Sequence, residues 1–181
     1  MVNIILKKIV KNKKTYPSWS TGSTYFLESK EKEENIEIYY KTKSNRKISR
    51  IFPKKLNLTP KLAYALGFIK GEGANALGKS NYRRFTLTNA DPKIMLFVLK
   101  ELDKNNLLKI SNLKREAIHL LHHNKSDSEV INYWSRNLNL PKKLFKCFED
   151  KNKTSDYGVC HVYVSDVLLR RVIDLIHEKF L

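Results

Sequence analysis

Apolar residues recur at helical spacing in four parts of the chain, and the residues in front of each run are typical N-caps. Helices are expected after Thr59, Asp91, Ser126 and Asp166. A short polar side chain at that position accepts hydrogen bonds from the first free backbone N–H groups of a helix. Proline follows two of these caps and fits the first helical position. The first helix is expected to run from about Pro60 to Gly71.

Between these helices the pattern changes to runs that favour strands. Strands are expected near Ala74–Leu77, Tyr82–Thr88, Leu113–His122 and Tyr157–Val164. A short helical turn is expected from Pro141 through Phe148. The resulting order is helix, two strands, helix, strands, helices, strand, helix. It predicts an α+β fold for residues 58–181.

Residues 1–57 differ from the rest and are interpreted as a basic N-terminal extension. The first 58 residues hold 14 lysines and arginines against five acids, a net charge of +9. Ser29–Asn35 is expected to be a loop. The extension is predicted either to be β-rich and packed on the core or to be partly mobile. Its β-like runs are Asn3–Val10, Ser23–Leu27, Ile36–Thr42 and Lys47–Phe52.

The charge of the whole chain narrows the choice of partners. A formal net charge of +17 over 181 residues favours a polyanion, and nucleic acid is the usual one. No long basic amphipathic helix points to a membrane surface, and no apolar run approaches the roughly 20 residues of a membrane span. The start, MVNIILKKIVKNKK, is too interrupted by lysine for a signal peptide. With only two cysteines, the chain is expected to be cytoplasmic or otherwise intracellular, and not secreted.

The most unusual segment is the first helix, within LTPKLAYALGFIKGEGA. Ala63, Gly67 and Gly71 follow at four-residue spacing, so one face carries almost no side-chain bulk. Glycine inside a helix costs roughly 1 kcal/mol against alanine. Two on one face indicate that another backbone approaches there. Glu72 then lies at the negative end of the helix dipole, which indicates a nearby cation.

The segment ALGFIKGEG resembles the signature motif of the LAGLIDADG homing endonucleases. Gly67 takes the place of the motif's first glycine, Gly71 that of its small residue and Glu72 that of its second acid. Lys70 stands where the motif has its first acid. The resemblance implies an αββαββα core with a curved antiparallel sheet over residues 58–181. With a single motif, it also implies a homodimer paired through Ala63, Gly67 and Gly71.

The chemistry implied by the resemblance is site-specific cleavage of double-stranded DNA by a divalent metal ion. Glu72 and the backbone carbonyl of Gly71 would bind Mg²⁺, with Mn²⁺ as the alternative ion. Asn89 is the second catalytic candidate, as a residue that positions water. Equally, Asn89 fits ordinary turn chemistry before Asp91. An assisting basic residue stays open among Lys114, Lys142, Lys143 and Lys146.

DNA reading is expected on the sheet face that points away from the helices. Phe85 and Leu87 are expected to face the helices, which would turn Arg84 and Thr86 toward DNA. Base contacts and phosphate contacts would come from Lys70, Asn75, Lys79, Arg83, Arg84 and Thr86.

Two other functions fit the same residues. One is a DNA-binding regulator of the same fold that no longer cuts, which Lys70 favours. The other is an RNA-binding cofactor of intron splicing. The histidines His119, His122, His123 and His161 lack the spacing of known metal motifs and are interpreted as structural or phosphate contacts. The cysteines are interpreted as core residues.

Overall fold

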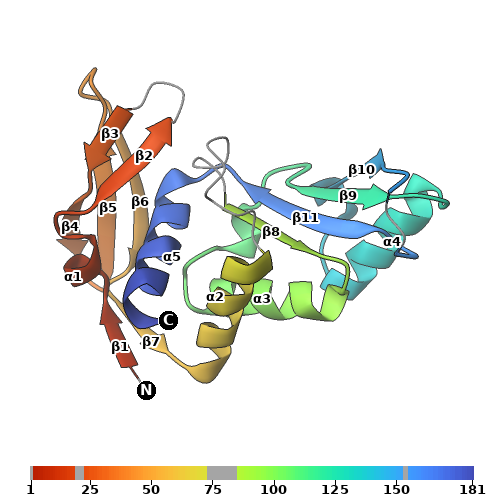
Figure 1. Cartoon of the computed structure of the whole chain (residues 1–181), viewed down its shortest axis with the longest axis horizontal. Coiled ribbons are helices and arrows are strands. Elements are labelled where there is room, and N and C mark those ends of the chain that lie inside the picture. Colours follow the sequence, from red (N-terminus) through yellow and green to blue (C-terminus); the bar gives the residue numbers. More distant parts are fainter. Residues whose placement is uncertain (1, 19–22, 73–84, 153–154) are drawn as a thin grey trace.

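The computed structural model describes residues 2–18, 23–72, 85–152 and 155–181. They form a mixed α+β structure in which helices and sheets share one hydrophobic core. Figure 1 shows the N-terminal strands on one side of the molecule and a four-stranded sheet with its helices on the other. None of the helices in the described residues combines the length and the apolar character that crossing a membrane requires.

The N-terminal part is built from short antiparallel strands and one helical turn. Strand β1 pairs with β7, β2 with β3, and β5 with both β4 and β6. The elements are β1 (Val2–Ile5), α1 (Leu6–Val10), β2 (Lys14–Ser18), β3 (Ser23–Phe26), β4 (Glu28–Lys32), β5 (Asn35–Lys41), β6 (Lys47–Pro53) and β7 (Lys55–Leu58).

Two elements of this part differ from the sequence prediction. The expected strand Asn3–Val10 ends at Ile5 and continues as α1, because Leu6, Ile9 and Val10 then bury one helical face. The expected loop Ser29–Asn35 contains β4. The alternating charges of β4 are compatible with a strand whose side chains face solvent. The strand is also paired with β5 along its whole length.

The rest of the described chain, from α2 to α5, forms a four-stranded sheet with helices on one of its faces. The sheet order is β10-β9-β11-β8, with β10 and β9 parallel and the other pairs antiparallel. The elements are α2 (Pro60–Glu72), β8 (Phe85–Asn89), α3 (Pro92–Lys104), the 3₁₀ turn η1 (Ile110–Asn112), β9 (Ile118–His122), α4 (Asp127–Leu138), the 3₁₀ turn η2 (Lys142–Leu144), β10 (Phe145–Glu149), β11 (Val159–Val164) and α5 (Val167–Phe180). The strand predicted near Ala74–Leu77 lies outside the described residues.

The predicted helix starts are confirmed by the hydrogen bonds of their caps. Asp91 accepts from the Lys93 backbone N–H at 2.7 Å, and Ser126 forms a full capping box with Glu129. Asp166 accepts from the N–H of Leu169 at 2.9 Å. The predicted helical turn from Pro141 through Phe148 is right only for η2, because the chain then joins the sheet edge as β10.

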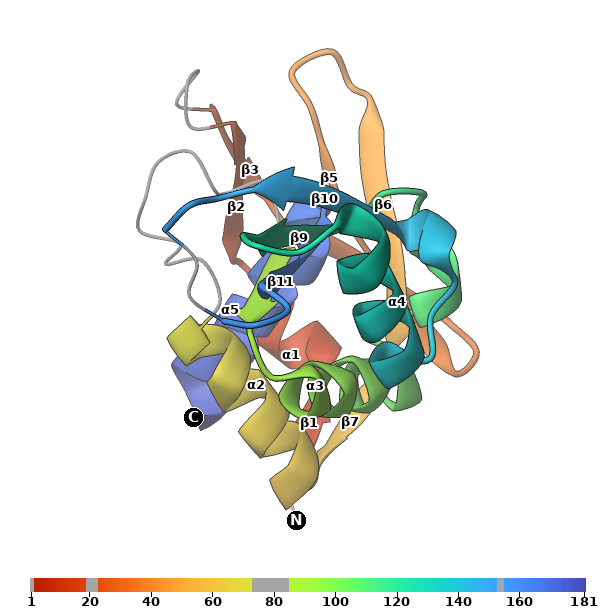
Figure 2. The ribbon, with the colours of Figure 1, turned by 90° about the vertical axis from the view of Figure 1, so that its right-hand side faces the viewer.

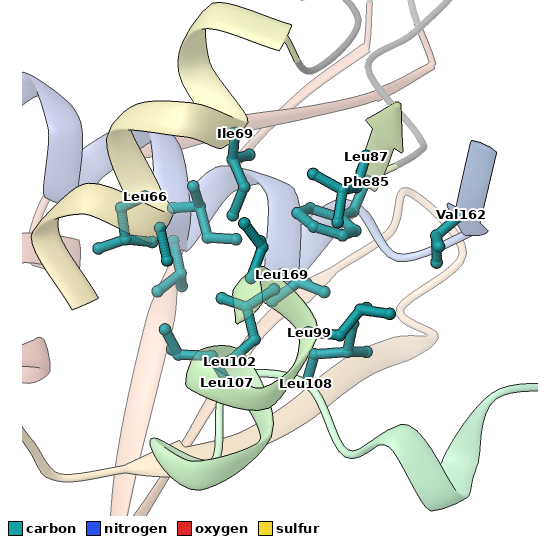
Figure 3. Close-up of a cluster of buried hydrophobic side chains, with 14 of the residues drawn as sticks. Leu66, Ile69, Phe85, Leu87, Leu99, Leu102, Leu107, Leu108, Val162 and Leu169 are labelled. Atoms are coloured by element: carbon teal, nitrogen blue, oxygen red, sulfur yellow. The ribbon is translucent and has the colours of Figure 1, made fainter. Parts of the chain in front are cut away.

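The hydrophobic core is made where α2, α3 and α5 meet the inner face of the four-stranded sheet. Figure 3 shows Leu66 and Ile69 of α2 pointing toward Leu102 and Leu169, with Phe85 beside them. All five side chains are almost fully buried. Each buried side chain of this size contributes about 1.5–3 kcal/mol, so the position of α2 on the sheet is strongly specified.

The two halves are joined through α5, which packs on both of them. In Figure 1, α5 lies between the N-terminal strands and α2, and it contacts α1, β2 and β6. Arg50 of β6 pairs with Asp166 at the start of α5 and donates to the carbonyl oxygen of Leu107 at 2.7 Å. Arg171 donates to the carbonyl oxygen of Lys14 at 2.8 Å. These contacts place the N-terminal part, here called the N-terminal wall, against α5.

Candidate nucleic-acid interface

The glycine-bearing helix α2 buries one face and leaves the other open. Leu62, Ala65, Leu66 and Ile69 are buried, while Gly67 is exposed. Gly71 is exposed in the same way, and Ala63 is half-buried between the two faces. Among the described residues, a Cβ atom added at Gly67 or Gly71 would meet no atom within 4 Å apart from the helix's own backbone. The small-residue face thus lies at the surface of the single chain.

The position of α2 is fixed by hydrogen bonds at its start and at its middle. Thr59 accepts from the N–H of Leu62 through its hydroxyl at 3.2 Å. His177 of α5 donates from Nε2 to the carbonyl oxygen of Leu66 at 2.7 Å. Burial holds the pKa of His177 below its ordinary value, and nearby Lys70 lowers it further, although the bond to Leu66 acts in the opposite direction. At pH 7 the lowered pKa favours the neutral imidazole, which donates this bond from Nε2.

Several predicted site residues fall outside what the structure describes. Glu72 is the last residue of α2, but its side chain is not among the described groups. Asn75, Lys79, Arg83 and Arg84 lie within residues 73–84, outside the described ranges. Their roles in metal and DNA binding stay predictions. Lys70 is described, and its side chain is exposed near the C-terminal end of α2.

Asn89 is engaged in the turn that leads into α3. Its Oδ1 accepts from the backbone N–H of Asp91 at 2.7 Å, and Asp91 in turn caps the helix. This is the turn chemistry that the sequence offered as the alternative to catalysis. Thr86 was expected at the surface facing DNA, but its side chain is only 4% exposed. It is not available to a ligand in this conformation.

The face of the four-stranded sheet that points away from the helices, here called the outer face, carries polar and aromatic side chains. In the described part of the chain no helix covers it. Strand pairing places Thr88 beside His161, His161 beside His119 and His119 beside Lys146. The hydroxyl of Thr88 and Nδ1 of His161 are hydrogen-bonded at 2.9 Å. Burial alternates along β9 and β11, which places His119, His161 and Tyr163 on the outer face.

Rings on the outer face contact one another across three strands. The ring centroid of His119 lies 4.6 Å from that of Tyr163 and 4.9 Å from that of Phe148. The ring of Tyr163 is stacked with His161 at 5.9 Å, and Lys146 lies over Phe148 at 5.5 Å. Flat rings beside a cation form the kind of surface on which nucleic-acid bases stack. Sequence reasoning did not identify these rings as a group, because they come from three strands distant in the sequence.

A cleft of about 740 Å³ continues the outer face toward the N-terminal part. It lies between β6, the connection from α3 to β9, and the start of α5, and His119 and Tyr163 belong to its lining. Its described charged residues are four basic and two acidic ones, namely Arg50, Lys109, Lys114, Arg115, Glu116 and Asp166. This excess of basic over acidic residues suits the phosphate backbone of a nucleic acid. Lys114 is the only one of the four assisting-lysine candidates in this lining.

The connection between β5 and β6, residues 41–47, is here called the basic hairpin tip. Figures 1 and 2 show it projecting beyond the sheet, on the side opposite to α2 and α3. Asn45 adopts a left-handed backbone with φ 58°, and Thr42 accepts from the N–H groups of Asn45 and Arg46. The tip holds four exposed cations and no acid: Lys41, Lys43, Arg46 and Lys47. It is a second source of positive charge, carried by the N-terminal strands and separated in Figure 1 from the four-stranded sheet.

Comparison with known proteins gave no match, either among protein-family models or among curated proteins and solved structures.

Proposed function

We propose that this chain is a homodimeric, Mg²⁺-dependent endonuclease that cuts double-stranded DNA, built on a LAGLIDADG-type core. The observation that carries the proposal is the orientation of α2. Its apolar face is buried on its own sheet, and the face with Gly67 and Gly71 is open to a partner backbone. A second copy of the same helix fits such a face, because the interface of a twofold dimer is complementary to itself.

Pairing through α2 would explain why an acid, Glu72, is the last residue of this helix. The two helix ends meet in such a pair, which brings two carboxylates and two Gly71 carbonyl groups together. The last four carbonyls of a helix have no intrahelical partner, so that of Gly71 fits a hard cation such as Mg²⁺. When bound, Mg²⁺ stabilises negative charge on a phosphate and lowers the pKa of bound water. The ion would be held by the Glu72 carboxylate and the Gly71 carbonyl, and other side chains of the protein would position the DNA.

The DNA path in this proposal follows the outer face and the cleft. Cations at the cleft and at the basic hairpin tip contact phosphates and set the position of the duplex. The net charge of +17 supports a polyanionic partner, and the N-terminal wall provides part of that charge. The basic residues release counterions on binding, so affinity should fall steeply with salt.

The test separates cutting from binding. Wild-type protein and a Glu72→Gln variant are incubated with a genomic DNA library and Mg²⁺, and cleavage ends are sequenced. The wild type is expected to give discrete double-strand ends. The variant is expected to give none, while it binds the recovered site with wild-type affinity. Glu34→Gln, an exposed carboxylate on the β4–β5 turn, is the matched control and should cut normally.

Absence of wild-type cleavage with Mg²⁺ and with Mn²⁺ would overturn the nuclease activity and leave a DNA-binding regulator of the same fold. A monomeric mass at working concentration would remove the paired helices and the site between them.

One observation favours a different partner. The rings of His119, Tyr163 and Phe148 suit unstacked bases, which single-stranded RNA presents more readily than duplex DNA. A salt titration that compares structured intron RNA with duplex DNA decides between them. Tighter binding to RNA at every salt concentration would make the chain an RNA-binding splicing cofactor.

A further inference from the structure

Three side chains with different donor atoms meet at the end of the sheet where β9, β10 and α4 come together. His122 is the last residue of β9, Asp127 is the first of α4, and Cys147 lies in the middle of β10. Their nitrogen, oxygen and sulfur atoms all lie within 4.8 Å of one another. The sequence did not indicate this group, because Cys147 is distant from the other two and its strand was not predicted.

Secondary structure holds all three positions. The parallel register of β10 on β9 pairs Cys147 with Leu120, whose side chain is buried. By alternation, Cys147 and His122 therefore face the same side, against α4. The capping box at Ser126 fixes the first turn of α4 and with it Asp127. None of the three lies on a long loop, so the group is preorganised.

The separations are close to those that a tetrahedral ion needs. Nε2 of His122 lies 2.9 Å from Oδ1 of Asp127, and the ligand atoms of all three residues lie within 4.8 Å of one another. Zinc bonds of about 2.0–2.3 Å at tetrahedral angles place neighbouring ligand atoms about 3.3–3.8 Å apart. Small side-chain shifts would bring the three donors to those separations.

The donor set also selects the kind of ion. Imidazole and thiolate are borderline-to-soft ligands that suit Zn²⁺, whereas Mg²⁺ and Ca²⁺ take oxygen ligands. The imidazole of His122 is only 4% exposed, and its Nδ1 has no hydrogen-bond partner among the described residues. Asp127 is largely exposed, with 71% of its side chain accessible. An ion can therefore enter from the side of Asp127.

We propose that His122, Asp127 and Cys147 form a binding site for Zn²⁺, with water in the fourth position. The ion joins the start of α4 to the edge strand β10 and to β9. It is a structural ion, separate from the Mg²⁺ proposed at α2. The proposal does not depend on the proposed function.

The test uses cobalt as the probe, without DNA. Metal-free full-length protein is titrated with Co²⁺, followed by competition with Zn²⁺. We expect saturable binding of one ion per chain, with a thiolate-to-cobalt absorption band that Zn²⁺ abolishes. Cys147→Ser should lose the band, whereas Cys160→Ala, which removes the other thiol, should keep it.

A second variant removes one ligand at an exposed position, where misfolding is not expected. Asp127→Asn changes an exposed side chain, so the fold should survive, and we expect its Zn²⁺ affinity to fall at least tenfold. Zn²⁺ should raise the thermal midpoint of the wild type, and this rise should shrink in the Asn variant. Absence of the band in the wild type, or its survival in Cys147→Ser, would overturn the site. In that case the three residues are a hydrogen-bonded cluster only.

Discussion

Replacing Gly67 by alanine gives opposite results for the single chain and for a dimer paired through α2. In the single chain the new methyl group points away from the described residues, none of which has an atom outside the helix backbone within 4 Å of it. The substitution also removes an interior glycine from a 13-residue helix. In the paired state, the same methyl group from each copy would stand between two closely packed backbones.

The size of each effect follows from these surroundings. Alanine is about 0.8–1.0 kcal/mol more favourable than glycine in a helix interior, so the free energy of unfolding of the monomer should rise by about that amount. The corresponding rise in the thermal midpoint is about 2–4 °C for a chain of this size. Overpacking of the helix pair should cost about 1–3 kcal/mol, which raises the dimer dissociation constant by a factor of about 5 to 150.

Two measurements on Gly67→Ala and the wild type check this. Denaturant unfolding at concentrations below the dimer dissociation constant gives the monomer stability. Sedimentation over a range of concentrations gives the dissociation constant itself. An unchanged dissociation constant would refute the pairing through α2. A less stable monomer would refute the placement of Gly67 on an open helical face.

Three further predictions follow from other positions. Gly158→Ala should lower the free energy of unfolding by about 1–3 kcal/mol, measured by denaturant titration, since φ is +74° there and a Cβ atom would overlap the carbonyl oxygen of Leu121. The pKa of His177 is lowered in the folded chain, so the unfolded chain binds a proton there more readily. The resulting contribution to the free energy of unfolding is intact above about pH 6.5 and is lost as the pH falls through the pKa of His177 in the folded chain. The unfolding midpoint of the wild type should fall from pH 8 to pH 5, and that of His177→Gln should fall less. An equal pH dependence in the two proteins would contradict this prediction. Lys43→Ala at the basic hairpin tip should reduce the slope of log affinity for DNA against log salt by about 0.9, while Lys100→Ala, an exposed lysine on α3, should leave the slope unchanged.

The parts of the fold that could be predicted are those encoded over short distances. The caps at Asp91, Ser126 and Asp166 were read correctly, because a cap depends on residues within one helical turn. The same holds for α2, where the glycine spacing and the apolar face belong to one helix. The α+β class followed from the order of such local segments.

The parts that could not be predicted depend on contacts between distant residues. FKCFE gave no strand signal of its own and is a strand because β9 offers it a parallel edge. Leu6–Val10 is a helical turn because its three apolar residues reach the core only in that geometry. The cluster of His122 with Cys147 and the row of rings on the outer face arise from strand register, which residue spacing within one segment does not encode.

The position of α5 has a consequence for synthesis of the protein. Its side chains complete the packing of α1, β2 and β6, elements that leave the ribosome more than a hundred residues earlier. Such contacts have a high sequence separation, which slows folding and exposes apolar surface in the meantime. The apolar residues of the elements that α5 contacts, among them Ile9, Val10 and Phe52, are buried in the folded chain. We expect a nascent chain that stops before Val167 to bind chaperones, and the N-terminal wall to become protease-resistant only once α5 has emerged.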